Sequence, residues 1–362
     1  MLLPLFLALG CEKATAPEVP LPLPLTGRIV FQSDRVDPLG DIFAITFDGS
    51  DVRRLTTSSA GESCPSISPD ANWIAYYSTT GDPRNSGTVY TMWLMRANGT
   101  EPREIVEVGH PSGCPLWSRS SDMIEASFTN DSYVAGAVVV EQTTIFGVDG
   151  QEIGHLQGSL YYPAAFSADG TEFLVQHEGY CGRGGCTLGD IYVMKRDGPF
   201  ERWLTGDATG GAFIQEGAET PSLGPDGTTV TYICSDHVQS SLRGLCVVKW
   251  DGTGKTLLGS NTNAFSNPTF SPDGTKISFT CLSGNTSVLC FMDSNGGNLV
   301  TSSVANDFGT PFNWTPDGTH LIFSCGTGKD LCSVPSGGGE VTNLTHSDGT
   351  NASPSMPTVT SQ

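Results

Sequence analysis

One short pattern recurs along almost the whole sequence, and its clearest copy is at residues 267–296. In this copy a short apolar segment is followed by Ser-Pro-Asp-Gly at 271–274, two more apolar segments and Asn-Gly at 295–296. The first of these predicts a tight turn, because proline presets φ at the second position and glycine accepts a left-handed conformation at the last. The Asn-Gly pair predicts a β-hairpin. A single sheet of this kind cannot bury both of its faces, so it requires similar sheets on either side.

Such neighbouring sheets are present in the sequence. The Ser-Pro-Asp-Gly turn recurs, in complete or degraded form, at 68–71, 118–121, 167–170, 224–227 and 315–318. The hairpin pair occurs seven times, 42 to 54 residues apart, at 48–49, 98–99, 149–150, 197–198, 251–252, 295–296 and 337–338. A repeat of about 45 residues that contains four short strands is typical of a β-propeller blade. The predicted fold class is therefore all-β, a seven-bladed β-propeller with four-stranded antiparallel blades.

Six complete repeats and one divided repeat account for the seven blades. Blades two to seven are expected at 62–106, 112–156, 160–205, 218–258, 265–301 and 309–345. Residues 29–31, 41–45 and 53–56 give the second, third and fourth strands of blade one, whose first strand is missing at that end. Residues 352–356 resemble the segment that opens blade two. We therefore expect the C-terminal strand to complete blade one, which closes the ring and removes exposed sheet edges.

Two positions beside the first turn have structural roles in this scheme. The residue before each turn is large and apolar, and we expect it to pack between blades: Ile67, Trp117, Phe166, Leu223, Phe270 and Trp314. The aspartate within the turn is expected to accept hydrogen bonds from the turn itself and to have no catalytic role. These aspartates are Asp70, Asp169, Asp226, Asp273 and Asp317.

Composition narrows the classes of function. Only 15% of the residues are charged, whereas 44 glycines and 23 prolines supply the many connections of an all-β protein. The formal net charge of −20 argues against nucleic acid as a partner, because a phosphate backbone requires a basic surface. Solubility alone accounts for the acidity, and a channel that attracts cations is the alternative.

The 11 cysteines are arranged in pairs that predict disulfides. In blades five, six and seven, one cysteine ends the second strand and another is the second residue of the third strand, so the two are expected to face each other across a hairpin. These predicted bonds are Cys234–Cys246, Cys281–Cys290 and Cys325–Cys332. Cys181 and Cys186 flank a tight glycine-rich loop and are also expected to pair. Cys64 and Cys114 each precede the proline that opens an inner strand, which predicts a bond between blades two and three.

These pairings indicate the compartment. Each bond is expected to contribute roughly 2–4 kcal/mol, and least where the loop is short. Zinc binding is less favoured, because the C-x4-C and C-x6-C pairs have no histidine at matching spacing. Five disulfides indicate an oxidising compartment and leave only Cys11 unpaired.

The unpaired cysteine follows an apolar N-terminal segment. Residues 1–10 are too few to cross a bilayer and resemble the end of a secretory signal peptide. Residues 7–11, Leu-Ala-Leu-Gly-Cys, resemble a bacterial lipobox, which implies cleavage before Cys11 and lipidation of that residue. By the usual sorting pattern, the absence of aspartate after the cysteine implies the outer membrane, facing the periplasm or the cell surface. An ordinary signal peptide is the alternative.

The chain is thus expected to have three parts. Residues 1–10 form a lipoprotein signal peptide, 11–26 a proline-rich tether, and 27–362 the seven-bladed propeller. Four prolines lie in the tether, at 17, 20, 22 and 24. Such a segment is semi-rigid and extended, and it reaches on the order of 45 Å, which holds the propeller clear of the bilayer.

The blade pattern resembles the TolB-type propeller repeat. Its marks are a proline-led strand, Ser-Pro-Asp-Gly, a strand such as Ile-Tyr-Val-Met at 191–194, Asp-Gly, and an ending such as Arg-Trp-Leu-Thr at 202–205. The resemblance extends from residue 27 to about residue 356 and implies a propeller of the bacterial envelope. TolB itself has an α/β domain before a six-bladed propeller, and this sequence contains no such domain.

Related propellers include enzymes, and their catalytic signatures are missing from the sequence. The hydrolase domain of prolyl-oligopeptidase-type enzymes requires a Gly-x-Ser-x-Gly elbow, which this sequence lacks. Oligogalacturonate lyases are related seven-bladed proteins that use a histidine-bound metal. The six histidines share no spacing or motif: His110, His155, His177, His237, His320 and His346. We therefore assign no catalytic, cofactor-binding or metal-binding residue and expect no cofactor.

The predicted function is that of a non-catalytic envelope lipoprotein. We expect a monomer that serves as a protein-interaction or ligand-binding scaffold and touches the membrane only through its lipid anchor. Its partner would be an envelope protein, a peptide or a glycan. Two alternatives stay open, a metal-dependent polysaccharide lyase-like enzyme and a secreted, unlipidated binding protein.

Overall fold

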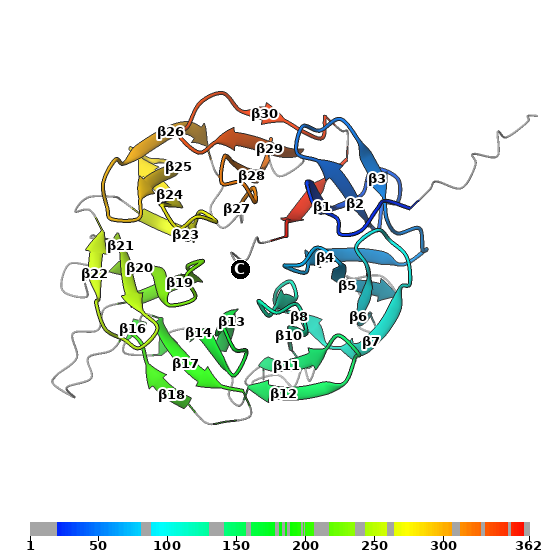
Figure 1. Cartoon of the computed structure of the whole chain (residues 1–362), viewed down its shortest axis with the longest axis horizontal. Coiled ribbons are helices and arrows are strands. Elements are labelled where there is room, and N and C mark those ends of the chain that lie inside the picture. The colour runs from blue at the N-terminus through cyan, green and yellow to red at the C-terminus, as the bar shows by residue number, and fades with distance from the viewer. Residues whose placement is uncertain are drawn as a thin grey trace, which may run out of the picture.

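Seven small sheets surround a central channel, and each has the antiparallel, four-stranded form expected of a blade (Figure 1). The computed structural model describes residues 20–80, 88–129, 141–156, 161–177, 181–182, 185–186, 189–196, 198, 200–205, 217–235, 243–258, 264–305, 312–326, 330–346 and 349–357. The regular elements in these ranges are all strands, and no helix there is long and apolar enough to cross a membrane. The predicted all-β, seven-bladed propeller is confirmed.

The strands of each blade follow one another outward from the channel. Blade two contains β4 (Gly61–Ile67), β5 (Trp73–Thr80), β6 (Val89–Arg96) and β7 (Arg103–Val108). Blade three has a divided inner strand, β8 (His110–Pro111) and β9 (Leu116–Trp117), then β10 (Met123–Thr129), β11 (Glu141–Gly147) and β12 (Glu152–Leu156). Blade four contains β13 (Tyr161–Phe166), β14 (Glu172–His177), β17 (Asp190–Lys195) and β18 (Phe200–Trp203), with a small hairpin of β15 (Cys181–Gly182) and β16 (Gly185–Cys186).

The next three blades repeat the same order. Blade five contains β19 (Gly217–Leu223), β20 (Thr229–Ser235), β21 (Arg243–Lys249) and β22 (Thr256–Leu258). Blade six contains β23 (Ala264–Phe270), β24 (Lys276–Ser283), β25 (Thr286–Asp293) and β26 (Val300–Ala305). Blade seven contains β27 (Phe312–Trp314), β28 (His320–Cys325), β29 (Asp330–Pro335) and β30 (Thr342–Asn343).

Blade one joins the two ends of the described chain. Its order from the channel outward is β31 (Asn351–Ser355), β1 (Arg28–Ser33), β2 (Asp41–Thr46) and β3 (Val52–Arg54). β31 is antiparallel to β1, with Val30 opposite Ser355 and Gln32 opposite Ala352. Figure 1 shows the C-terminal strand beside the first strand at the inner edge of the ring. The predicted closure is confirmed, and it covers the edge that β1 would otherwise expose.

The two ends of the ring differ in their connections. We call the end that carries the Ser-Pro-Asp-Gly and hairpin turns the turn face. The other end, which carries the connections between the second and third strands and between blades, is called the loop face.

On the turn face, each Ser-Pro-Asp-Gly turn is held by its own side chains. The Ser271 hydroxyl donates to Asp273 Oδ1 at 2.6 Å, and the Thr275 N–H donates to the same oxygen at 3.0 Å. Gly274 takes the left-handed conformation at φ +71°. These contacts, first the one from Ser271, lower the pKa of Asp273. The equivalent aspartates also accept from their own turns: Asp70, Asp169, Asp226 and Asp317. The turn role predicted for them is confirmed.

The large residue before each turn packs across a blade boundary, as expected. Trp117 Nε1 donates to the Ser66 carbonyl of blade two at 2.9 Å, and Trp314 Nε1 donates to the Thr269 carbonyl of blade six at 3.1 Å. The remaining residues of this kind lie in or against the apolar clusters of the blades: Ile67, Phe166, Leu223 and Phe270. Each cluster is apolar area removed from water, which is the main stabilising contribution of the ring.

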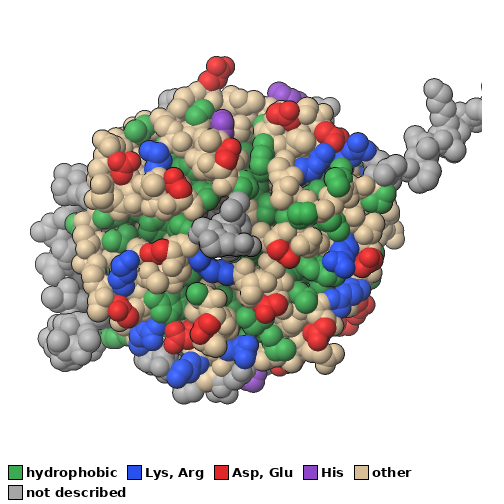
Figure 2. Space-filling view, in the orientation of Figure 1, with side chains coloured by type: hydrophobic (Ala, Val, Ile, Leu, Met, Phe, Trp, Pro, Cys, Tyr) green, Lys and Arg blue, Asp and Glu red, His purple; other side chains and the backbone are tan. Residues whose placement is uncertain are grey.

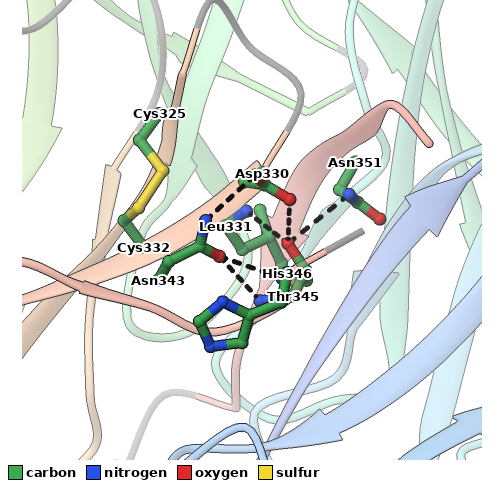
Figure 3. The surroundings of a disulfide bond; sticks show 8 residues. All are labelled: Cys325, Asp330, Leu331, Cys332, Asn343, Thr345, His346 and Asn351. Atoms are coloured by element: carbon green, nitrogen blue, oxygen red, sulfur yellow. Dashed lines mark hydrogen bonds between the residues drawn. A yellow bond between two sulfur atoms is a disulfide. The ribbon is translucent and has the colours of Figure 1, made fainter. Parts of the chain in front are cut away.

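On the loop face, the Leu-Thr ending of the repeat ties the outer strand to the third strand. The Thr345 hydroxyl accepts from the Leu331 N–H at 3.0 Å and donates to Asp330 Oδ1 at 2.7 Å (Figure 3). The amide-to-threonine bond recurs in two further blades, from Ile42 to Thr56 at 2.9 Å and from Ile191 to Thr205 at 3.1 Å. The threonine of the repeat is therefore a structural residue that satisfies a backbone donor.

A polar side chain of the following blade reaches the same threonine at two blade boundaries. Between blades seven and one, Asn351 Nδ2 donates to Thr345 Oγ1 at 3.5 Å (Figure 3). Between blades one and two, Glu62 takes the equivalent place and accepts from Thr56 Oγ1 at 3.2 Å. Glu62 is 2% exposed and lies near the buried Asp41. Burial, with a smaller effect of the Asp41 charge, raises the pKa of Glu62.

Glu62→Gln is expected to stabilise the ring at neutral and alkaline pH. A carboxyl whose folded-state pKa is raised contributes stability that is present below its unfolded pKa of about 4.3 and is lost as the pH rises through the folded value. Glutamine keeps the shape and stays neutral, so it removes this loss. Urea unfolding at pH 4, 6 and 8 should show that Glu62→Gln has a higher free energy of unfolding than the wild-type chain, by a difference that grows with pH. The exposed Glu340→Gln is the control, and an equal pH dependence in all three chains would contradict the prediction.

Four of the five predicted disulfides are formed by described side chains. They are Cys64–Cys114, Cys234–Cys246, Cys281–Cys290 and Cys325–Cys332. In the fifth pair, Cys181 stands opposite Cys186 in the β15–β16 register, and the side chains of both lie outside the described residues. The first bond joins the inner strands of blades two and three, and the other three lie within single blades.

The three bonds within blades have a different register from the expected one. The prediction placed the two cysteines of each pair opposite each other, but they lie on a diagonal. Cys234 stands opposite Gly244, two residues before Cys246, and Cys281 stands opposite Val288, two residues before Cys290. Blade seven repeats this offset, with Cys325 opposite Asp330. The third strands begin earlier than predicted, and an offset of two keeps both cysteines on the same face of the sheet.

The described part of the N-terminal segment packs against blade two. The Leu25 N–H donates to the Ala71 carbonyl at 2.7 Å, and Asn98 Nδ2 donates to the Leu21 carbonyl at 3.1 Å. Leu25 is 2% exposed within an apolar cluster of blades one and two. The end of the predicted tether is thus held on the turn face. Residues 1–19, including the predicted signal peptide and Cys11, lie outside the described residues.

Candidate functional site

The main hollow of the described structure is a cavity of about 610 Å³ in the channel. Its walls are the innermost strands of blades three to seven and the turns that follow them, together with Met356 and Pro357 just after β31. Figure 1 shows these strands converging on the centre of the ring, and Figure 2 shows hydrophobic side chains between the blades and around that centre. The volume lies within the range of ordinary ligand pockets.

The wall of this cavity is rich in proline. Seven prolines line it: Pro163, Pro221, Pro225, Pro268, Pro272, Pro316 and Pro357. Some open the inner strands and others belong to the Ser-Pro-Asp-Gly turns of the repeat. Because proline has no N–H, the inner edges of these strands are poor templates for an added strand. A ligand is therefore held by side chains and by apolar contact, and not by extension of a sheet.

The residue before the strand proline takes an unusual backbone conformation. Thr220 and Asn267 have φ of +50° and +53°, and both line the cavity. The strand register shifts at these positions, between Glu219 and Ser222 in β19 and between Ser266 and Thr269 in β23. Such bulges re-aim side chains and occur beside binding sites.

Thr220 and Asn313 hold the wall in place across blade boundaries. Its N–H donates to Gln176 Oε1 of blade four at 2.8 Å, which fixes the backbone across the blade boundary. Its Oγ1 is buried and has no hydrogen-bond partner in the described part of the chain. Asn313 also lines the cavity, and its Nδ2 donates to the Pro354 carbonyl at 2.8 Å, which leaves its carbonyl oxygen as an acceptor. The wall thus offers the neutral amide of Asn313, whereas the Thr220 hydroxyl is enclosed within the wall.

Arg119 is the one charged residue among the described residues that line the cavity. It replaces the proline of the first turn in blade three, a degraded turn in the sequence. Its Nη1 and Nη2 donate to the carbonyls of Pro225 and Gly224 in blade five, at 2.8 and 2.6 Å. The side chain thus crosses the turn of blade four, where Ala168 leaves room; Ala168 and Arg119 both lie close to Gly227 of blade five.

This arginine is partly buried and lies near one carboxylate, that of Asp226. Burial lowers the pKa of Arg119, and the nearby Asp226 opposes that effect. A guanidinium stays charged even so. Asp226 itself accepts from Thr228 and Thr229 and lies 3.6 Å from Lys249. Sequence reasoning missed the role of Arg119, and the only signal was an arginine at a position where the other turns have proline or alanine.

The histidines, which a metal-dependent enzyme of this kind would use, are spread over several blades. The described histidines lie on different elements: His110 in β8, His155 in β12, His177 in β14, His320 in β28 and His346 after β30. His237 lies outside the described residues. Within the described ranges, no group of three or more His, Cys, Asp or Glu side chains is placed to hold a metal ion.

No protein-family model and no curated protein matches the sequence. Among solved structures, the chain is similar to TolB from Acinetobacter baumannii, with a TM-score of 0.51 and 17% identity, over 77% of this chain and 65% of TolB, just under two thirds. It is similar to an oligogalacturonate lyase in complex with manganese, with a TM-score of 0.63 and 13% identity over 82% of each chain. It is also similar to the β-propeller domain of the Trilobed protease from Pyrococcus furiosus, with a TM-score of 0.60 and 17% identity over 85% of this chain and 88% of that one.

The third of these has an open velcro topology, whereas β31 closes the ring in the present chain. Identities of this size establish a shared architecture. The chain therefore has a β-propeller fold, an architecture that it shares with TolB and with the other two proteins.

Proposed function

We propose that the chain is a non-catalytic binding protein whose ligand site is the channel cavity. The observation that carries this proposal is the wall itself, which combines prolines and aromatic rings with the neutral amide of Asn313 and the cation of Arg119. Acid–base catalysis requires a positioned titratable group, and the described lining has no aspartate, glutamate or histidine. An apolar pocket with a few convergent polar groups is the usual form of a binding site.

The proposal extends to the envelope and to a lipid anchor. Four disulfides among the described residues support an oxidising compartment. The N-terminal segment leaves the ring on the turn face, so lipidation of Cys11 would direct that face toward the membrane. Labelled palmitate should enter the wild-type chain and not Cys11→Ser. Equal labelling of both chains, or labelling of neither, would show that Cys11 does not carry a lipid anchor.

Binding in the cavity is expected to be lost when the cavity is filled. Ser222 lines it and is partly buried, and Ser222→Trp adds a bulky ring at the wall. We expect short peptides to raise the melting temperature of the wild-type chain and to have little effect on Ser222→Trp. Ser336→Trp, at the turn after β29, is a control for the added ring. Equal shifts in all three chains would place binding elsewhere.

The lyase-like alternative rests on the similarity to the manganese-bound oligogalacturonate lyase. Oligogalacturonate and metal analysis are the tests that separate it from the binding proposal. Release of unsaturated products, or bound metal in stoichiometric amount, would favour the enzyme. Their absence in a chain that binds peptides would favour the binding protein.

A further inference from the structure

The position of Arg119 suggests which end of a ligand the cavity receives. The guanidinium has five N–H groups, and two of its nitrogens each make one bond, to the carbonyls of Gly224 and Pro225. Up to three N–H groups remain for a ligand. The charge of Asp226 acts on Arg119, but among the described residues the ion-pair partner of Asp226 is Lys249, at 3.6 Å, and no described carboxylate forms an ion pair with Arg119. The cavity is therefore complementary to an anionic group at this end.

A second hollow limits where the anionic group of a ligand can bind. It measures about 530 Å³, lies beside the first on the turn face, and shares Pro225, Phe270 and Pro272 with it. Asp226 and Asp273 line this second hollow. A carboxylate is repelled there and is attracted to Arg119, so charge sets one preferred orientation for a ligand with a single anionic end.

The wall beyond Arg119 indicates the chemistry of the rest of the ligand. Thr220 lies four residues before Gly224 along the wall, which corresponds to roughly 13 Å at the rise of a strand. A ligand that extends from Arg119 along this wall as far as Thr220 therefore spans about four extended residues. The side-chain amide of Asn313 matches the N–H and C=O of peptide units, and the prolines match small apolar side chains.

We infer that the channel cavity binds the C-terminal end of a short, apolar peptide, with its free carboxylate on Arg119. This inference rests on the proposed binding function and specifies its ligand. The carboxylate takes the N–H groups of Arg119 that the blade-five carbonyls leave unused, and the peptide runs along β19 toward Thr220. Because the inner edges carry prolines, the peptide is held by side-chain contacts and not as an added strand.

The test uses the full chain and a fluorescently labelled Ala-Pro-Ala-Pro-Phe, either with a free carboxylate or as the C-terminal amide. We expect the free acid to bind the wild-type chain at least about 10-fold more tightly, since hydrogen bonds to charged groups are among the stronger ones. Arg119→Gln should bind both forms with nearly equal affinity, and Arg119→Lys should recover part of the preference. Arg53→Gln, which removes an equal charge from blade one, should keep the full preference.

Several outcomes would overturn the inference. If the wild-type chain binds the acid and the amide with equal affinity, the cavity does not recognise the free carboxylate. Loss of binding of both peptides in Ser222→Trp would then still support binding in the cavity. If an equal concentration of N-acetylproline displaces the peptide, the ligand of the cavity is a small carboxylic acid and not a peptide. Binding only after removal of residues 358–362 would make that segment the occupant. Since Arg119 also joins blades three and five, Ser222→Trp provides a second variant, which should weaken binding of the acid and of the amide alike because the added ring fills the cavity.

Discussion

Removal of the C-terminal strand is expected to abolish the folded ring. A chain that ends at His346 lacks β31, and with it Asn351 and Met356, which are 0% and 7% exposed. It also leaves the inner edge of β1 unpaired and loses the contact of Asn351 with Thr345. Domains are stable by only about 5–15 kcal/mol, so the loss of an inner strand is comparable with the whole stability.

Circular dichroism and urea unfolding provide the measurement. We expect the shortened chain to have no cooperative transition, or a midpoint far below that of the full chain. A chain that ends at Pro357 keeps all of β31 and serves as the matched control. Cooperative unfolding of the His346 chain at the wild-type midpoint would show that six blades and an incomplete seventh are sufficient for the ring.

The fold could be predicted from the sequence because its determinants are local and repeated. Ser271, Asp273 and Gly274 interact within one turn, and the same residue types recur in other blades. The partner of each cysteine was predictable for the same reason, since strand order brings the ends of a hairpin together. The exact register was not, because the cysteines of a pair such as Cys234 and Cys246 are diagonal neighbours, and this depends on where the third strand begins.

The candidate site could not be predicted in the same way. Arg119 contacts Gly224 and Pro225, which are 105 and 106 residues further along the chain. No periodicity encodes a contact between blades three and five that passes over blade four. The pairing of Glu62 with Thr56 is also hidden, because a glutamate in an inner strand looks like a surface residue until the neighbouring blade covers it. Function resides in the departures from the repeat, and the repeat itself specifies the scaffold.

Loss of the Cys64–Cys114 bond is expected to destabilise the ring more than loss of any disulfide within a blade. A disulfide acts mainly on the unfolded chain, and its contribution grows with the length of the loop that it closes. Cys64 and Cys114 are 50 residues apart, whereas the three bonds within blades span 12, 9 and 7 residues. The loop-entropy relation gives about 4 kcal/mol for the first bond and about 2.5 kcal/mol for each of the others.

Paired Cys→Ala replacements, each made in a Cys11→Ser background, provide the comparison. Replacing both cysteines of a bond avoids a free thiol that can exchange with the remaining disulfides. Unfolding in urea should rank Cys64→Ala/Cys114→Ala as the least stable of the four pairs, by roughly 1.5 kcal/mol relative to Cys325→Ala/Cys332→Ala. The bond also joins two blades near the channel, so its loss should lower the cooperativity of unfolding. Equal losses for all four pairs would show that strain or burial, and not loop length, determines what each bond contributes.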